Sequence, residues 1–217
     1  MLEKWCDKMW LYVLYAIGAV MTAVLIINWQ IWPVIQKILV LFTIILPLHV
    51  LEEWQIPGGF HYQYNIMQKS QYPDRYPMNR LTDMITNFGG ELFMIGLAIY
   101  GANTGIIIAV AVFSALEVII HTIFGIKMYN RFKTKGKRTI YGPGSVTAYA
   151  GFGTMGLLSL YWLIISGTRP AEWGLAGVIL FVMLAGFILI PENLLKNKKT
   201  AYPFKSTGYF NKYLINK

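Results

Sequence analysis

One long apolar segment indicates how the chain folds: Val34-Ile-Gln-Lys-Ile-Leu-Val-Leu-Phe-Thr-Ile-Ile-Leu-Pro-Leu-His-Val-Leu-Glu-Glu-Trp54. Its length matches that of a membrane-spanning helix, for which about 20 mostly apolar residues are needed. Near its end lie His49, Glu52 and Glu53, and positions i, i+3 and i+4 share one side of a helix. Ionisable groups in such a segment are costly and favour a functional site. The alternative at this point is a segment that simply ends here, with its glutamates in water.

Composition indicates an all-α, polytopic membrane protein. The chain has 217 residues, of which 56% are hydrophobic and 13% charged, and its mean hydropathy is +0.48. Other apolar runs are also long enough to cross a bilayer. The single cysteine, Cys6, excludes an intramolecular disulfide and a multi-thiolate metal site. We expect one transmembrane domain over residues 1–192 and a basic cytoplasmic tail over 193–217. The expected helices are 9–29, 34–54, 82–100, 103–127, 143–167 and 172–190.

The distribution of basic residues predicts the orientation. With six spans, 17 of the 19 Lys and Arg residues fall on the side of the two termini, and only Lys37 and Arg169 on the other. Lys and Arg concentrate in cytoplasmic loops, so we expect cytoplasmic termini. The net charge of +9 then reflects topology and contact with anionic lipid headgroups. Nucleic acid is not an expected partner, because the basic residues flank spanning helices.

Ionisable residues of three predicted helices share one depth in the membrane. At 1.5 Å per residue they occupy a cytoplasmic layer roughly 10 to 15 Å thick. Charged groups in hydrocarbon tend to face one another, so we predict a common polar site. Its candidate members are His49, Glu52, Glu53, Glu91, Glu117 and His121.

Three motifs carry a resemblance to a known family. His49-Val-Leu-Glu-Glu53, Pro57-Gly-Gly-Phe60 and Tyr141-Gly-Pro-Gly-Ser-Val-Thr-Ala148 together resemble the HXXEE family of bacterial integral membrane proteins, over about residues 34–190. The resemblance implies a polytopic helical protein of the bacterial inner membrane with a His/Glu site, metal-dependent and enzymatic in the favoured interpretation. It implies no particular reaction. Of the candidate site residues, the motif itself covers only His49, Glu52 and Glu53.

The donor set favours a divalent metal. Imidazoles and carboxylates without thiolates suit Zn²⁺, our first choice, or a harder ion such as iron or manganese. We predict His49, Glu53, Glu117 and His121 as ligands and Glu52, Glu53 and Glu91 as catalytic acid/base residues. Such a site activates water for hydrolysis, and a membrane bundle suits a lipid or other apolar substrate. The oligomeric state is not predicted.

Two other functions remain open from the sequence. A buried glutamate and histidine can move protons without a metal, as in a membrane isomerase. Intramembrane carboxylates also serve proton- or ion-coupled transporters. The long segment 55–83 contains His61, an additional candidate ligand, although the favoured interpretation is an aromatic interfacial loop. Thr147 is expected to bond back to its own helix rather than to line the site.

Overall fold

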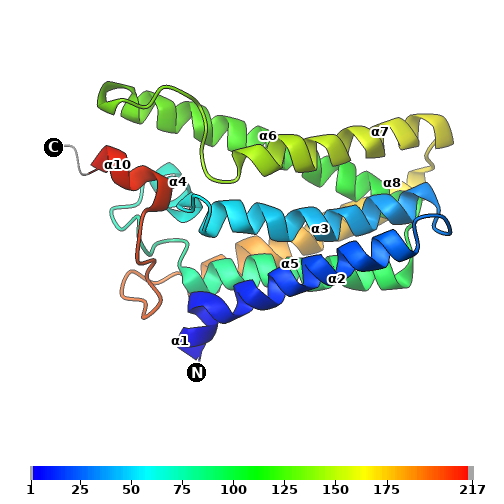
Figure 1. Ribbon diagram of the computed structural model, residues 1–217, viewed down its shortest axis with the longest axis horizontal. Helices are drawn as coiled ribbons and strands as arrows, with labels where there is room; N and C mark the ends of the chain where they lie inside the picture. Colours follow the sequence, from blue (N-terminus) through cyan, green and yellow to red (C-terminus); the bar gives the residue numbers. More distant parts are fainter. Residues whose placement is uncertain (1, 215–217) are drawn as a thin grey trace.

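The computed structural model describes residues 2–214, which form a bundle of six long helical rods (Figure 1). Each rod runs along the long axis of the molecule, and both termini lie at the same end. In chain order the first rods are α1 Leu2–Lys4 with η1 Trp5–Met9 and α2 Trp10–Ile27, then α3 Val34–Trp54, α5 Arg80–Tyr100, and α6 Thr104–Phe132 with η2 Lys133–Lys135. The remaining rods are η3 Thr147–Gly153 with α7 Thr154–Ser166, and α8 Pro170–Phe181 with η4 Val182–Leu189 and α9 Ile190–Leu195.

Five of the rods are long and apolar enough to cross a membrane, so the chain is an integral membrane protein. They are Leu2–Ile27, Val34–Trp54, Thr104–Lys135, Thr147–Ser166 and Pro170–Leu195. The sixth, α5, has 21 residues but carries buried polar side chains, among them Asp83 and Glu91. It packs against α3 and η4. The six expected helices are therefore all present, and α5 is the polar one.

Local turn chemistry moves several helix ends away from their predicted positions. The third rod begins at Arg80, not 82, because Asn79 and Thr82 form a reciprocal capping box. The fourth continues to Phe132, beyond the predicted 127. The fifth begins at Thr147, not 143, because the segment 142–145 forms a turn closed by the Ser145 N–H and the Gly142 carbonyl.

The helix α3 lies at the centre of the bundle and packs against α2, α5, α6 and α7. Its Phe42 meets Phe113 of α6 and Phe152 of η3 in an aromatic cluster with ring centroids 5.3 to 5.9 Å apart. The ring of Phe152 also meets that of His49 edge to face at 5.2 Å. Close packing of these rings stabilises the position of α3 and therefore of the polar residues about two to three turns further along it.

The C-terminal segment folds back over the end of the bundle that carries the termini. It ends in η5 Gly208–Phe210 and α10 Asn211–Leu214, close to α4 Phe60–Met67 of the 55–83 segment (Figure 1). The Tyr209 N–H donates to the Gly58 carbonyl at 3.0 Å. Phe210 and Tyr213 are buried beside Phe132. Much of the predicted basic tail is thus a packed part of the fold.

Candidate metal centre

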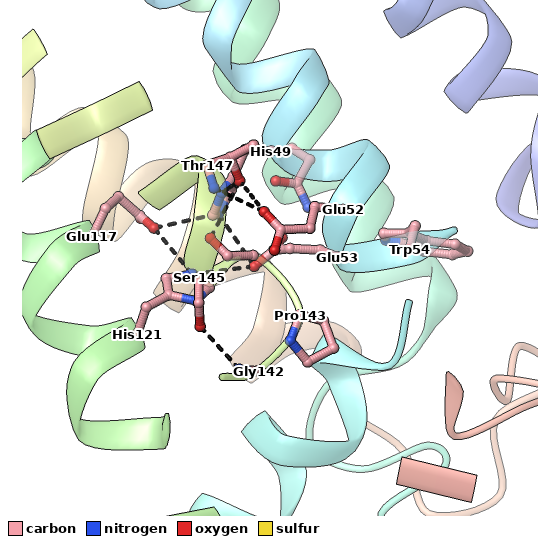
Figure 2. Close-up of polar contacts among 12 residues, drawn as sticks. His49, Glu52, Glu53, Trp54, Glu117, His121, Gly142, Pro143, Ser145 and Thr147 are labelled. Carbon is pink, nitrogen blue, oxygen red and sulfur yellow. Dashed lines mark hydrogen bonds and ion pairs between the residues drawn. The ribbon is translucent and has the colours of Figure 1, made fainter. Parts of the chain in front are cut away.

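Two helices each supply a histidine and a glutamate four residues apart. The helix α3 provides His49 and Glu53, and α6 provides Glu117 and His121. Residues at i and i+4 lie on one face of a helix, and the two faces meet inside the bundle (Figure 2). The imidazole centroids are 4.9 Å apart. Both histidines and Glu53 are buried, whereas the Glu117 side chain retains 19% of its exposure.

Each carboxylate lies between the two imidazoles. Glu53 Oε1 is 3.3 Å from His49 Nε2 and 3.4 Å from His121 Nε2. Glu117 Oε2 is 3.5 Å from both Nε2 atoms. The four side chains therefore alternate around a common centre, histidine and glutamate in turn. The ligand atoms of His49, Glu53 and His121 all lie within 4.8 Å of one another, a grouping able to hold a metal ion.

The first glutamate of the motif, Glu52, faces the start of the fifth rod instead. Its carboxylate accepts hydrogen bonds from the Val146 N–H at 3.1 Å and the Thr147 N–H at 2.8 Å. These groups begin a helix, where backbone N–H groups lack partners within the helix and attract negative charge. The Thr147 hydroxyl at 2.7 Å and the Tyr141 hydroxyl at 3.1 Å complete the set. Glu52 thus joins α3 to the fifth rod.

Thr147 connects Glu52 to the imidazole of His49. Its Oγ1 lies 2.8 Å from His49 Nδ1 and 2.7 Å from Glu52 Oε2 (Figure 2). A carboxylate only accepts, so the hydroxyl proton points to Glu52 and the hydroxyl oxygen accepts from Nδ1–H. The network therefore assigns the proton of a neutral His49 to Nδ1 and leaves the Nε2 lone pair facing the centre. This arrangement is typical of metal-ligating histidines, whose other nitrogen donates to a second group.

A glycine allows the backbone to pass directly against the imidazoles. Gly144 has a φ of +89°, and a β-carbon there would overlap His121 and come within 2.9 Å of Glu53 Cγ and 3.0 Å of His49 Cε1. The turn that contains Gly144 is also closed by the Gly142 N–H, which donates to Ser145 Oγ at 3.0 Å (Figure 2). Burial and the neighbouring Glu52 raise the pKa of the Tyr141 hydroxyl in this segment, which keeps it a donor.

A cavity of about 170 Å³ adjoins the centre. Its polar wall includes His49, Glu53, Glu117 and, from α5, Asp83. The Asp83 carboxylate accepts from Trp54 Nε1 at 2.7 Å and from Asn87 Nδ2 at 2.7 Å. The rest of the wall is mostly apolar: Phe42, Leu46, Phe60, Met94, Phe113, Ile120, Met183, Phe187 and Ile188. Among the residues that the structure describes, no Lys or Arg lines this cavity.

The structure thus brings together all four predicted metal ligands and separates the other candidates. Glu91 is fully buried on α5, but it does not line the cavity, and within residues 2–214 neither carboxylate oxygen has a hydrogen-bond partner. His61 stacks on Phe204 with centroids 3.7 Å apart, away from the centre. The expectation that Thr147 bonds back to its own segment rather than lining the site is wrong. Its hydroxyl lies 3.2 Å from the Gly144 carbonyl, but it contacts Glu52 and His49 at the shorter distances of 2.7 and 2.8 Å.

Sequence reasoning did not identify Asp83, Tyr141 or Gly144 as parts of the site. The available signals were the position of Asp83 one turn before Asn87, and the place of Tyr141 and Gly144 in the third motif of the resemblance.

Comparison with known protein families gives a match to one family. A family model described as "Protein of unknown function with HXXEE motif" matches residues 40–159. This range contains all four side chains of the centre and the Gly144–Thr147 segment. No curated protein and no solved structure matches the chain.

Proposed function

We propose, from the premise that the chain belongs to the HXXEE-motif family, that it is a metal-dependent membrane enzyme. It binds a divalent ion between α3 and α6, and zinc is the favoured ion. It acts by hydrolysis on a lipid or another apolar molecule held in the adjoining cavity.

The spacing of the four side chains is the observation that carries this proposal. A direct imidazolium–carboxylate hydrogen bond places nitrogen and oxygen about 2.7–2.9 Å apart. Here all four nitrogen–oxygen distances are 3.3 to 3.5 Å. Two ligand atoms held about 2.0–2.1 Å from a tetrahedral zinc ion are about 3.3–3.4 Å apart. The spacing therefore suits a shared ion better than a set of ion pairs.

The charge balance of the cavity supports the same conclusion. Glu53, Glu117 and Asp83 line it together with His49, and neither Lys nor Arg does so within the described part of the chain. Taking an uncompensated carboxylate out of water costs several kcal/mol or more. A divalent ion between the imidazoles offsets this cost.

The residues have distinct expected roles. Two histidines and one glutamate are a common ligand set of catalytic zinc, which supplies hydroxide at neutral pH from a bound water. His49, His121 and Glu53 fit that set. Glu117, the most exposed of the four, borders the cavity and is placed to take and return a proton. Glu52 and Thr147 hold His49 in its orientation.

The shape of the cavity supports an amphiphilic substrate. Along α3 its lining runs from Glu53 through His49 to Phe42, about 16 Å at 1.5 Å per residue. Along α5 it runs in parallel from Asp83 to Met94. The polar end thus lies toward the termini and the apolar end toward the middle of the bundle. The three carboxylates disfavour an anionic group at the polar end.

The orientation follows from the charges of the loops. Most Lys and Arg residues of the sequence lie on the side of the termini, which we propose to be the cytoplasmic side. The resemblance to bacterial proteins supports the bacterial inner membrane as its location.

A product analysis in vesicles tests the proposal. Purified protein is reconstituted with a lipid extract, with and without a chelator, and the lipids are followed by mass spectrometry. We expect a lipid to be cleaved with gain of one water, in a reaction that the chelator stops and zinc restores. Glu117→Gln should slow it about a hundredfold or more, whereas Glu3→Gln, at an exposed position, should not.

Other outcomes of this experiment contradict the proposal in recognisable ways. A lipid rearranged without change of mass, in a reaction that survives the chelator, indicates acid/base isomerisation. Solute flux without any chemical change indicates a transporter.

A further inference from the structure

A second cavity of about 320 Å³ lies at the end of the bundle that carries both termini. Four segments form it: the first rod, the segment after α3, the start of α5 and the C-terminal segment (Figure 1). Its chemically informative lining residues are Asp7, Lys8, His61, Arg80, Phe204 and Lys205. The cavity is separate from the metal centre, because none of the four residues of that centre lines it.

Its charge is opposite to that of the first cavity. Three basic side chains, Lys8, Arg80 and Lys205, line it with one acid, Asp7. Asp7 accepts from Arg80 Nη1 at 2.8 Å and from Lys205 Nζ at 2.5 Å. Glu3, which is largely exposed, lies 4.0 Å from Arg80. Even with Glu3 counted, two carboxylates do not neutralise three cations, so this cavity and its edge retain a net positive charge.

The guanidinium of Arg80 is held in place, and one of its nitrogen atoms makes no hydrogen bond within the described residues. It is 97% buried, since only 3% of its side chain is exposed, and its Nε donates to the Pro203 carbonyl at 2.8 Å. Its Nη1 donates to Asp7, whereas Nη2 makes no hydrogen bond within residues 2–214 and only faces the largely exposed Glu3 carboxylate at 4.0 Å. A fixed guanidinium with free donors is well suited to a phosphate oxygen.

His61 provides an independent indication of a ligand. It is 6% exposed and lines the cavity, and its Nε2 atom has no hydrogen-bond partner in the described chain. The stacked Phe204 ring fixes its plane, with an interplanar angle of 6°. Burial lowers the pKa of His61 to about 3, so the ring is neutral at physiological pH. A buried nitrogen of this kind is expected to have a partner.

We infer that this cavity binds a phosphate group, carried by a membrane phospholipid or by a soluble phosphate compound. Arg80, Lys8 and Lys205 supply charge-assisted hydrogen bonds, and His61 supplies one neutral bond. The cavity lies where α2 and α5 begin and α3 ends. This is the side rich in Lys and Arg, at the depth of lipid headgroups.

Binding to the purified full-length protein tests this inference. Phosphatidylglycerol is titrated in detergent and followed by native mass spectrometry, with diacylglycerol as the probe that lacks phosphate. Inorganic phosphate is titrated separately and followed by thermal stabilisation. The variants are Lys8→Ala/Lys205→Ala and His61→Phe, which keeps an aromatic ring against Phe204. The matched control is Lys133→Ala/Lys135→Ala, two exposed lysines at the same end of the bundle.

We expect saturable binding that is about tenfold weaker in the first lysine pair, clearly weaker in His61→Phe and unchanged in the control pair. This pattern with phosphatidylglycerol, but not diacylglycerol, identifies a phospholipid headgroup. The same pattern with inorganic phosphate identifies a soluble phosphate compound. Equal losses in both lysine pairs, no loss in His61→Phe, or no binding of either probe to wild type would overturn the inference. Elution and helix content of each variant establish that it is folded.

Discussion

Thr147 Oγ1 lies between His49 Nδ1, at 2.8 Å, and Glu52 Oε2, at 2.7 Å. The relationship gives the two glutamates of the motif different tasks. Glu53 faces the centre, whereas Glu52 acts on it only through Thr147 and the start of η3. A π-helical turn at that start is an irregularity that often marks functional sites.

Thr147→Val should therefore weaken metal binding while leaving the four side chains of the centre in place. Valine has the same shape but neither accepts from Nδ1 nor donates to Glu52. Loss of such an orienting bond costs about 10- to 100-fold in metal affinity. Thr147→Ser keeps the hydroxyl and should restore most of it. The affinity is measured by competition with a coloured chelator, and equal affinities of the valine variant and wild type would refute the orienting role.

Gly144 and Gly136 form a matched pair for a second prediction. Their φ angles are +89° and +90°, so alanine strains the backbone similarly at both, by about 1–2 kcal/mol. A β-carbon at position 136 meets nothing within 4 Å, whereas at 144 it overlaps the imidazole of His121. We expect Gly136→Ala to bind metal normally and Gly144→Ala to lose it. Equal metal content in the two folded variants would contradict this close approach.

His61 predicts a loss of stability in acid. Burial holds its pKa near 3, against about 6.5 in the unfolded chain. The unfolded state therefore takes up a proton as the pH falls below 6.5, while the folded state does not until about pH 3. The stability contribution is complete above pH 6.5 and is reduced by about 2 kcal/mol at pH 5. Thermal unfolding of chelator-treated wild type and His61→Phe should show a weaker acid dependence in the variant; parallel pH profiles would disprove it.

The sequence indicated the depth of each polar side chain in the membrane much better than the direction in which the side chain points from its helix. Hydropathy placed the body of every long helix, although the first rod begins at Leu2 rather than at 9 and the fourth continues to Lys135 rather than to 127. The i, i+4 spacing paired His49 with Glu53 and Glu117 with His121. Glu91 shares their depth, but the α5 face that lines the cavity carries Asp83, Asn87 and Met94. A four-residue step between Asn87 and Glu91 turns the side chain only about 40° on an ideal helix. The packing of neighbouring helices determines whether this rotation takes the Glu91 side chain off the face that lines the cavity. A single sequence does not contain this information.

Loop and tail contacts were beyond prediction for a related reason. Gly144 approaches His121 only because the chain turns back along α6, where Gly125 makes room for the Ile140 backbone. Likewise His61 meets Phe204 from a segment far along the chain. Such long-range contacts are set by tertiary packing rather than by local pattern.

The chain has three histidines, and this allows a direct test of the central claim. The metal content of the purified protein is measured by elemental mass spectrometry for wild type, His49→Ala, His121→Ala and His61→Ala. We predict close to one equivalent of zinc in wild type and in His61→Ala, and its loss in the other two. No metal in folded wild type that has been given zinc, or equal metal in all four proteins, would contradict a metal centre between α3 and α6.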